Sequence, residues 1–268
     1  MLLNRIMRNL FLNAEGIAEI PDYDGNLIID LNLAEHMQSR IFWLGYYSQS
    51  IIQYFNSYIE QGMTVIDVGA NIGEVTLAAA NRVKSTGKVI AFEPVTHIHA
   101  TLSKNISKNR LHWVEPVKLG LSEKSGNAVI YASSNGDINE LENIGLGTLY
   151  PMEGRRVPIE EIQLASLDSY LTDNPIERLD LIKIDIEGAE LPCLLGAKET
   201  IQKFKPHIIL ETQKETYVAA GYSPEDLVEF FSPLKYEIFR LGVNGSLHEV
   251  TTESLNDFQN IVARPKME

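Results

Sequence analysis

The chain has 268 residues, with 36 acidic residues against 23 lysines and arginines, and a formal net charge of −13. This length fits one large α/β domain with an N-terminal extension, and the charge argues against nucleic acid and anionic membranes as partners. The single cysteine, Cys193, excludes an intramolecular disulfide, and because no apolar run reaches eighteen residues we expect a cytoplasmic protein without stable membrane insertion.

The sequence predicts that residues 1–60 form an N-terminal extension with capping helices. A turn-rich stretch at 21–26 separates two short apolar segments, which predicts a hairpin within residues 1–32. Between residues 33 and 59 the apolar side chains recur at helical spacing with a break near Gly45. We therefore expect two helices before the first strand of the main domain.

Residues 61–268 predict that main domain. Apolar strands alternate with helical segments, and this rhythm indicates a parallel sheet with right-handed crossovers. Two final strands at 236–241 and 258–263 are expected to form a hairpin that closes the sheet. After a first strand that ends near residue 68, the expected elements are a helix at 74–83, a strand at 88–92, a helix at 97–109, strands at 113–119 and 179–185, a helix at 188–203 bent near Gly196, a strand at 207–211 and a helix at 224–231.

An insertion interrupts this rhythm. Residues 127–132 predict an extra short strand, and residues 133–158 form an irregular stretch rich in glycine and asparagine. A long loop inside a compact domain is mobile or functional. We expect it to act as a substrate lid.

A tight turn follows the first strand. The strand carries Asp67 near its end, and Gly69, Asn71 and Gly73 then open onto the next helix. Bare backbone and the N–H groups of a helix start predict a ligand site there. In a dinucleotide-binding turn of the form G-x-G-x-x-G, glycines would stand where this chain has Asn71 and Glu74, so pyrophosphate is a poor ligand. The acids instead favour a ligand with a cationic amino-acid portion, such as S-adenosylmethionine.

A second acid, Glu93, ends the second strand and is followed by Pro94. A carboxylate at this point can accept hydrogen bonds from both hydroxyl groups of a ribose. Nicotinamide dinucleotides and S-adenosylmethionine share that requirement, so Glu93 predicts a nucleoside ligand and the turn at Gly69 selects between the two. The alternative interpretation of Asp67 or Glu93 alone is a solvated strand end.

Two further strands also end in acids, Asp185 and Glu211, and Glu187 lies in the loop after Asp185. Like charges that converge on one sheet edge cost energy unless a cation lies among them. If their strands are neighbours, Asp185 and Glu211 could share one Mg²⁺ or Ca²⁺ ion, with Glu187 as a third ligand. In a metal-free alternative, Asp185 or Glu187 is the general base. Both routes stay open, and we interpret Lys183 as a structural ion-pair partner.

Taken together, these motifs resemble the FkbM family of S-adenosylmethionine-dependent methyltransferases, over roughly residues 45–263. The similar stretches are 65–73 (VIDVGANIG), 91–94 (AFEP), 120–122 with Gly126, 166–168, and 180–190 (DLIKIDIEGAE) followed by 195–197. One position departs from the family, because members often carry an acid where this chain has Ser48 after Tyr47.

The resemblance implies a class I methyltransferase, a Rossmann-like α/β fold with a mostly parallel seven-stranded sheet and helices on both faces. It also implies O-methylation of hydroxyl groups on sugars, glycoconjugates or natural products. Related sugar and catechol O-methyltransferases hold magnesium at the ends of strands four and five, which supports Asp185 and Glu211 as metal ligands. The cofactor-binding residues that it implies are Asp67, Gly69, Ala70, Asn71 and Gly73 at the methionine portion, Glu93 with Pro94 at the ribose, Leu121 and Ser122 at the adenine, and Asp185 at the amino group or the reacting hydroxyl.

The expected reaction is an in-line displacement in which a substrate oxygen attacks the methyl group, with Asp185, Glu187 and Glu211 as catalytic candidates. Most of the rate would come from positioning and electrostatics. We expect a small-molecule or saccharide acceptor and leave self-association into a homo-oligomer open. A nicotinamide-dependent oxidoreductase is disfavoured by Asn71 and Glu74, and a non-catalytic nucleoside-cofactor-binding protein is disfavoured by the three acids.

Overall fold

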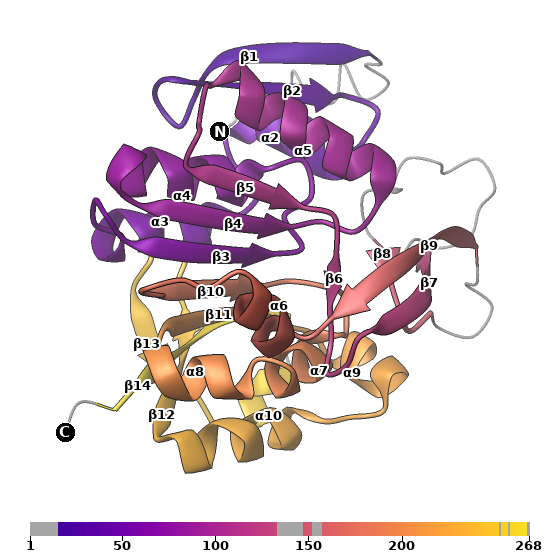
Figure 1. Ribbon diagram of the computed structural model, residues 1–268, viewed down its shortest axis with the longest axis vertical. Coiled ribbons are helices and arrows are strands. Elements are labelled where there is room, and N and C mark those ends of the chain that lie inside the picture. Colours follow the sequence, from indigo (N-terminus) through magenta and orange to yellow (C-terminus); the bar gives the residue numbers. More distant parts are fainter. Residues whose placement is uncertain (1–15, 133–146, 152–156, 252, 257, 267–268) are drawn as a thin grey trace.

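The computed structural model describes residues 16–132, 147–151, 157–251, 253–256 and 258–266. Its N-terminal part is an antiparallel hairpin followed by two helices (Figure 1). The hairpin and the helix break near Gly45 are confirmed, while the part of the first prediction that concerns residues 1–15 lies outside the described residues. The elements are β1 (Ile17–Tyr23), β2 (Leu27–Asn32), α2 (His36–Leu44) and α3 (Gln49–Tyr58).

A central eight-stranded sheet follows, with the strand order β13-β12-β14-β11-β10-β3-β4-β5. Five of its strands run parallel to one another, and all of them except the edge strand β5 carry buried apolar side chains on both faces. Such strands need a layer of helices on each side. The parallel strands are β3 (Thr64–Val68), β4 (Lys88–Phe92), β5 (Val114–Val117), β10 (Leu181–Ile184) and β11 (His207–Thr212).

The C-terminal part of the sheet corrects the prediction of seven mostly parallel strands. Strand β14 (Gln259–Pro265) lies between β11 and β12 (Tyr236–Leu241) and is antiparallel to both. The two last predicted strands therefore pair as expected, but one of them also joins the parallel strands. The turn after β12 folds a short additional strand, β13 (Leu247–Glu249), back onto the sheet edge, which gives the eighth strand.

Helices cover both faces of the sheet. Alternate strand residues belong to two separate apolar clusters, so that Val65 packs with α3 and α4 on one face and Ile66 packs with α7 and α10 on the other. Cys193 of α7 is buried as predicted. The helices are α4 (Glu74–Val83), α5 (Thr96–Lys108), α6 (Leu167–Asp173), α7 (Glu190–Leu195), α8 (Lys198–Phe204), α9 (Lys214–Ala220) and α10 (Pro224–Phe231), with 3-10 turns at Lys84–Thr86, Ser232–Leu234 and Glu253–Asn256.

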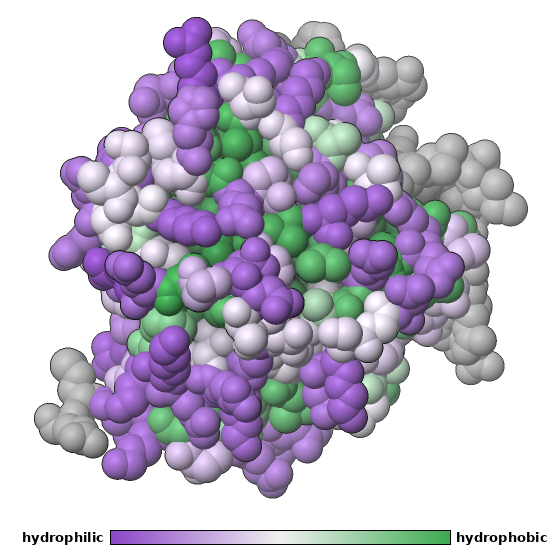
Figure 2. Space-filling view, in the orientation of Figure 1, coloured by the Kyte–Doolittle hydropathy of each residue, from purple (hydrophilic) through white to green (hydrophobic). Residues whose placement is uncertain are grey.

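The face of the molecule drawn in Figure 2 is mainly polar. On the face drawn in Figure 2, hydrophilic side chains surround small apolar areas, as expected where the helices turn their apolar sides inward. Within the described residues, none of the helices combines the length and the apolar character needed to span a bilayer.

A second, four-stranded sheet lies beside the carboxyl ends of β3 and β4 (Figure 1). One of its strands, β9, begins at the end of the segment that the sequence predicted to be irregular, and its buried residue is Ile162. Residues 133–146 and 152–156 of that segment lie outside the described residues. The strands are β6 (Gly120–Leu121), β7 (Gly126–Ala132), β8 (Gly147–Thr148) and β9 (Pro158–Ala165).

Candidate functional site

A cavity opens at the carboxyl ends of β3, β4, β10 and β11, where ligands bind in open α/β sheets. It encloses about 1050 Å³, including the open solvent at its mouth. One wall comes from the N-terminal loop between α2 and α3, and another comes from the small sheet. The cavity therefore joins parts of the chain that are far apart in sequence.

The turn after β3 forms one edge of this cavity. Gly69 and Ala70 both donate backbone N–H bonds of 3.0 Å to the carbonyl oxygen of Phe92, which fixes the turn against β4. Gly69 has a φ of +74°, and a Cβ atom there would lie 2.0 Å from the carbonyl oxygen of Asp185. Only glycine fits this position. Gly69, Ala70 and Asn71 line the cavity, whereas Gly73 packs beside Leu102 of α5 instead.

Asp67 does not reach the cavity wall. Its side chain is fully buried, accepts a hydrogen bond of 2.6 Å from the hydroxyl group of Thr76, and lies 3.4 Å from the ammonium group of Lys183. Asp67 and Lys183 are register partners on β3 and β10. The charge of Asp67 is thus balanced inside the protein, and it cannot meet the cationic end of a ligand in this conformation.

Lys183 holds several parts of the site together. Its ammonium group donates hydrogen bonds to the carbonyl oxygens of Gly69 (2.8 Å) and Val68 (3.3 Å), and it lies 3.7 Å from the carboxylate of Asp185. Burial lowers the pKa of Lys183, but Asp67 and Asp185 outweigh it, so that the pKa is raised and the ammonium form persists. Lys183 is the structural ion-pair partner that the sequence predicted, and it also lines the cavity.

Glu93 and Pro94 line the cavity at the end of β4. The carboxylate of Glu93 accepts backbone hydrogen bonds of 3.0 Å from Asn71 and from Val95. Burial raises the pKa of Glu93 to about 7, although these two hydrogen bonds oppose the shift. Each oxygen of the Glu93 carboxylate keeps a lone pair that could accept a hydrogen bond from a hydroxyl group.

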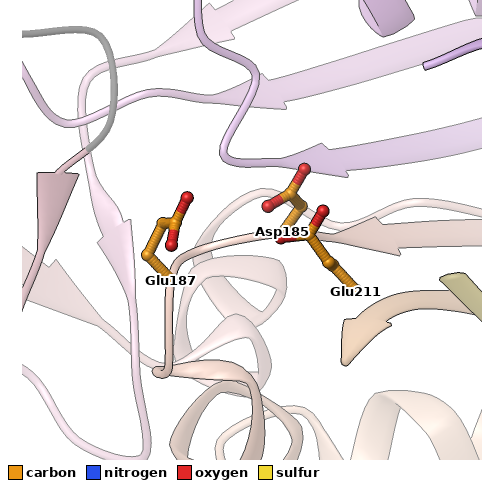
Figure 3. Close-up of side chains that lie close together, drawn as sticks. All are labelled: Asp185, Glu187 and Glu211. Atoms are coloured by element: carbon orange, nitrogen blue, oxygen red, sulfur yellow. The ribbon is translucent and has the colours of Figure 1, made fainter. Parts of the chain in front are cut away.

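Three acids gather on the opposite side of the cavity. Asp185 directly follows β10, Glu211 lies near the end of the paired strand β11, and Glu187 extends from the loop after β10. Carboxylate oxygens of all three lie within 4.8 Å of one another (Figure 3). Burial, followed by the charges of Asp185 and Glu190, raises the pKa of Glu187 to about 8. Burial and the neighbouring acids also raise the pKa of Glu211 well above its usual range. Oxygen ligands in this arrangement suit a hard divalent cation.

The N-terminal loop is held in the cavity wall by Glu74. Its buried carboxylate accepts hydrogen bonds from the backbone N–H of Tyr47 (2.6 Å), the backbone N–H of Ser48 (3.0 Å) and the hydroxyl group of Ser48 (2.9 Å). The serine that departs from the family pattern is therefore one of the contacts that fix the loop. Both Tyr47 and Ser48 line the cavity.

Comparison with known proteins gives this geometry a family. A sequence model described as the methyltransferase FkbM domain matches residues 67–238, which is more than half of the chain. The chain belongs to the FkbM methyltransferase family. It has the α/β fold expected of that family.

Individual relatives of this FkbM methyltransferase are distant. It is 28% identical over 171 residues to methyltransferase sdnD of Sordaria araneosa, covering 55% of this chain and 65% of sdnD. It is 25% identical over 190 residues to hexuronic acid methyltransferase AglP of Haloferax volcanii, covering 70% of this chain and 69% of AglP. The match to sdnD spans just under two thirds of that protein's length. The crystal structure of methyltransferase FkbM from Methylobacillus flagellatus aligns with a TM-score of 0.47 and 18% identity, over 80% of this chain and 50% of that one.

Several residues of the cavity wall were not predicted from the sequence. Of the two adenine candidates, Leu121 lines the cavity, but the backbone N–H of Ser122 donates a 2.9 Å bond to Ala165 and the residue is not in the wall. Ile162 and Leu164 of β9 are in the wall instead. Both follow the predicted insertion of 133–158, and their alternation with polar neighbours at 161–164 is a strand signal to which the sequence analysis assigned no element.

Proposed function

We propose that this FkbM methyltransferase transfers a methyl group from S-adenosylmethionine to a hydroxyl group of a sugar, glycoconjugate or natural product. The observation that carries this proposal is the cavity itself, which brings together the glycine turn, the strand-end acid Glu93 and the three clustered acids. These are the parts needed to bind a nucleoside, a cationic amino-acid portion and an acceptor oxygen in one space.

The lining residues fit the cofactor with one change from the sequence prediction. The backbone at Gly69 to Asn71 would hold the methionine portion, Glu93 with Pro94 the ribose, and Leu121 the adenine. Because Asp67 is neutralised by Lys183, the cationic end would be attracted by Asp185 and Glu211 instead. When bound, the cofactor supplies the methyl group and a good leaving group.

We further propose Mg²⁺ as a second cofactor, held by Asp185, Glu187 and Glu211. Their mutual proximity is the supporting observation, since a divalent cation would relieve the repulsion among like charges this close. A divalent ion would lower the pKa of the acceptor hydroxyl. In the metal-free alternative, Glu187 is the general base, and its pKa of about 8 suits proton transfer near neutral pH.

The residues of the chain act mainly by position. Lys183 fixes the carbonyl groups of the turn and the carboxylate of Asp185, while Glu74 fixes the N-terminal loop. Both partners of an in-line displacement would thereby be held close together and away from bulk water. The small sheet supplies an apolar wall, so we propose that the insertion at 133–158 forms a lid. Residues 1–60 precede the proposed methyltransferase domain of 61–268, and we propose that they complete the site.

The name of AglP, a hexuronic acid methyltransferase, supports a sugar-like acceptor. An uronic acid offers both hydroxyl and carboxyl oxygens, and the two products differ chemically. A methyl ether at a hydroxyl survives mild base, whereas a methyl ester is hydrolysed. Incubation with isotope-labelled S-adenosylmethionine and sugar acceptors, followed by base treatment, tests the hydroxyl assignment. Loss of all label would contradict it.

Cofactor binding is tested by calorimetry with S-adenosylhomocysteine. We expect Glu93→Gln to weaken binding about tenfold because an acceptor of ribose hydrogen bonds is lost. Glu177→Gln, the same change at an exposed residue outside the cavity, is the matched control. Binding of NAD⁺ but not of S-adenosylhomocysteine by the unaltered protein would favour the oxidoreductase alternative and overturn the proposal.

A further inference from the structure

An arginine lies against the cavity wall on the N-terminal side. The guanidinium carbon of Arg40 is 5.1 Å from the centroid of the Tyr47 ring, within the range of a cation–π contact. Tyr47 lines the cavity, and so does Met37, which lies one helical turn before Arg40 on the same side of α2. Arg40 itself is not a lining residue, and its guanidinium reaches the cavity wall through the Tyr47 ring.

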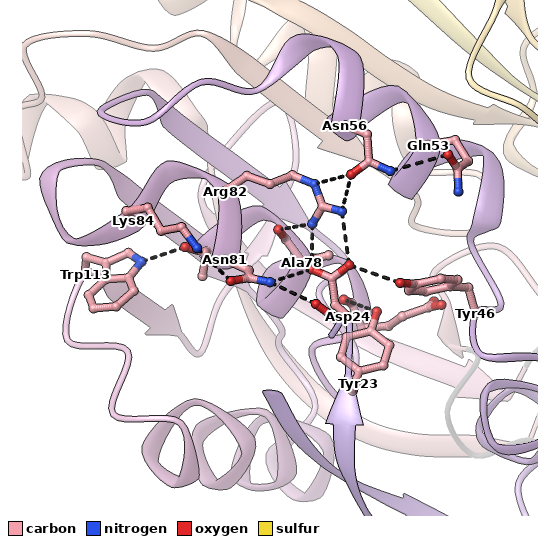
Figure 4. A network of polar contacts seen from close by, with 12 residues as sticks. Tyr23, Asp24, Tyr46, Gln53, Asn56, Ala78, Asn81, Arg82, Lys84 and Trp113 are labelled. Carbon is pink, nitrogen blue, oxygen red and sulfur yellow. Dashed lines mark hydrogen bonds and ion pairs between the residues drawn. The ribbon is translucent and has the colours of Figure 1, made fainter. Parts of the chain in front are cut away.

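Within the part of the chain that the structure describes, this guanidinium has no hydrogen-bond or ion-pair partner. Its Nε atom is buried without a hydrogen bond, and no carboxylate there lies within ion-pair distance. Arg82 shows the contrast: its guanidinium donates to both carboxylate oxygens of Asp24 and to the side chain of Asn56 (Figure 4). A buried donor without an acceptor is unfavourable, so an acceptor supplied by a ligand is expected at Arg40.

The charge pattern around Tyr47 indicates which kind of ligand would supply that acceptor. Burial raises the pKa of the Tyr47 hydroxyl to about 12, with Glu211 and Asp185 adding to the shift and Arg40 opposing it. Tyr47 thus lies near both the negative charges of the acid cluster and the positive charge of Arg40. A ligand with a cationic and an anionic group close together would match both.

We propose that Arg40 is the carboxylate-binding residue of this cavity. The carboxylate would come either from the methionine portion of S-adenosylmethionine or from an acidic acceptor such as an uronic acid. In the first case, the amino-acid end of the cofactor spans Tyr47, with its cationic groups toward Asp185 and Glu211. The guanidinium would hold the carboxylate through paired N–H donors, which a lysine cannot reproduce. This inference rests on the proposed function.

Calorimetry with two commercial ligands separates the sources. S-Adenosylhomocysteine carries the carboxylate, whereas 5′-methylthioadenosine has the same nucleoside without the amino-acid portion. If the cofactor supplies the carboxylate, Arg40→Gln weakens S-adenosylhomocysteine binding about tenfold or more and leaves 5′-methylthioadenosine binding unchanged. Arg40→Lys recovers only part of the loss. Arg240→Gln, at an exposed position on β12, is the matched control and retains both affinities.

A second arm tests the acceptor as the source. With S-adenosylhomocysteine present, methyl glucuronide and its neutral counterpart methyl glucoside are titrated into the unaltered protein and into Arg40→Gln. Selective loss of glucuronide binding would assign Arg40 to the acceptor. The inference is overturned if Arg40→Gln alters neither S-adenosylhomocysteine nor glucuronide binding. If the unaltered protein binds neither adenosine ligand, the proposed function itself fails, and the cofactor is excluded as the source of the carboxylate. This result differs from failure of the Arg40 inference alone, in which the unaltered protein and Arg40→Gln both bind normally.

Discussion

The hydroxyl group of Thr148 donates a hydrogen bond of 2.7 Å to the carbonyl oxygen of Glu187. This bond attaches strand β8 of the small sheet to the loop that carries one of the three clustered acids. The same hydroxyl oxygen accepts the backbone N–H of Tyr150 at 3.0 Å. Glu187 has a φ of +52°, a left-handed conformation that is rare for a residue with a side chain and that the surrounding contacts must maintain.

Replacing Thr148 by valine removes the hydroxyl group at nearly constant volume. We expect the free energy of unfolding to fall by about 1–2 kcal/mol, because two hydrogen bonds are lost at a buried position. Methyl transfer should fall as well, since Glu187 loses a support of its backbone. Urea unfolding and turnover measure the two effects. Thr148→Ser keeps the hydroxyl group and should keep the activity; equal activity in the valine and serine variants would contradict a positioning role.

Replacing Gly69 by alanine tests the close contact between the turn and β10. The new Cβ atom would lie 2.0 Å from the carbonyl oxygen of Asp185, so we expect a loss of at least about 3 kcal/mol in the free energy of unfolding. Gly221→Ala is the control, because Gly221 has a similar φ of +80° but no neighbour within 4 Å of the added Cβ. That variant should lose only about 1 kcal/mol. Similar losses in both variants would show that backbone conformation, rather than the contact, selects glycine at Gly69.

Replacing one acid of the cluster is expected to raise the stability of the protein, whereas the two preceding substitutions lower it. Glu211→Gln removes a carboxyl group whose pKa is raised by burial and by the neighbouring acids and which therefore costs stability near neutral pH, so without added metal we expect its melting temperature to rise by about 2–4 °C. Adding Mg²⁺ should raise the melting temperature of the unaltered protein and leave that of the variant nearly unchanged. Activity should fall in the variant and, for the unaltered protein, be removed by EDTA and restored by Mg²⁺. Activity indifferent to EDTA and Mg²⁺ would favour the metal-free route.

His207 predicts an acid-sensitive contribution to stability. Its ring lies 4.0 Å from the Tyr58 ring, and its Nδ1 atom lies 2.6 Å from the hydroxyl group of Tyr54. Burial lowers the pKa of His207 from 6.5 to about 4. The unfolded chain therefore binds this proton more readily than the folded protein, and the free energy of unfolding falls as the pH drops from 6.5 through 4.

Because the histidine is only partly buried, we expect it to account for about 1–2 kcal/mol of this loss. His207→Phe keeps the ring stacking and removes the titrating group, so its loss of stability between pH 7 and pH 4.5 should be smaller by that amount. Urea unfolding at the two pH values measures the difference. An identical pH dependence in both proteins would exclude His207 as the source.

The sequence predicted the parallel half of the fold well because its signals are local. The helix at 74–83 and the strand at 88–92 have the predicted bounds, and the adjacency of the strands that end at Asp185 and Glu211 follows from the regular alternation. The insertion was less readable, since β9 is stabilised by pairing with β7, more than thirty residues earlier in the chain.

The site was predictable in composition but not in orientation. A strand-end position does not show whether an acid faces a ligand or a neighbouring strand, and the direction of Asp67 depends on its register partner Lys183. The support that Glu74 gives to Ser48 and the contact between Arg40 and Tyr47 join separate elements of the N-terminal region. No short motif encodes such contacts.

The position of β14 has a consequence for biosynthesis. Strand β11 pairs on one side with β10, and its other side is covered by β14, which is made more than forty residues later. Until residues 259–265 leave the ribosome, β11 exposes an unpaired edge next to the acids of the site, and β12 has no strand between it and the rest of the sheet. A nascent chain can thus assemble the nucleoside side of the cavity early, but the sheet beneath Glu211 is complete only when this late strand has inserted.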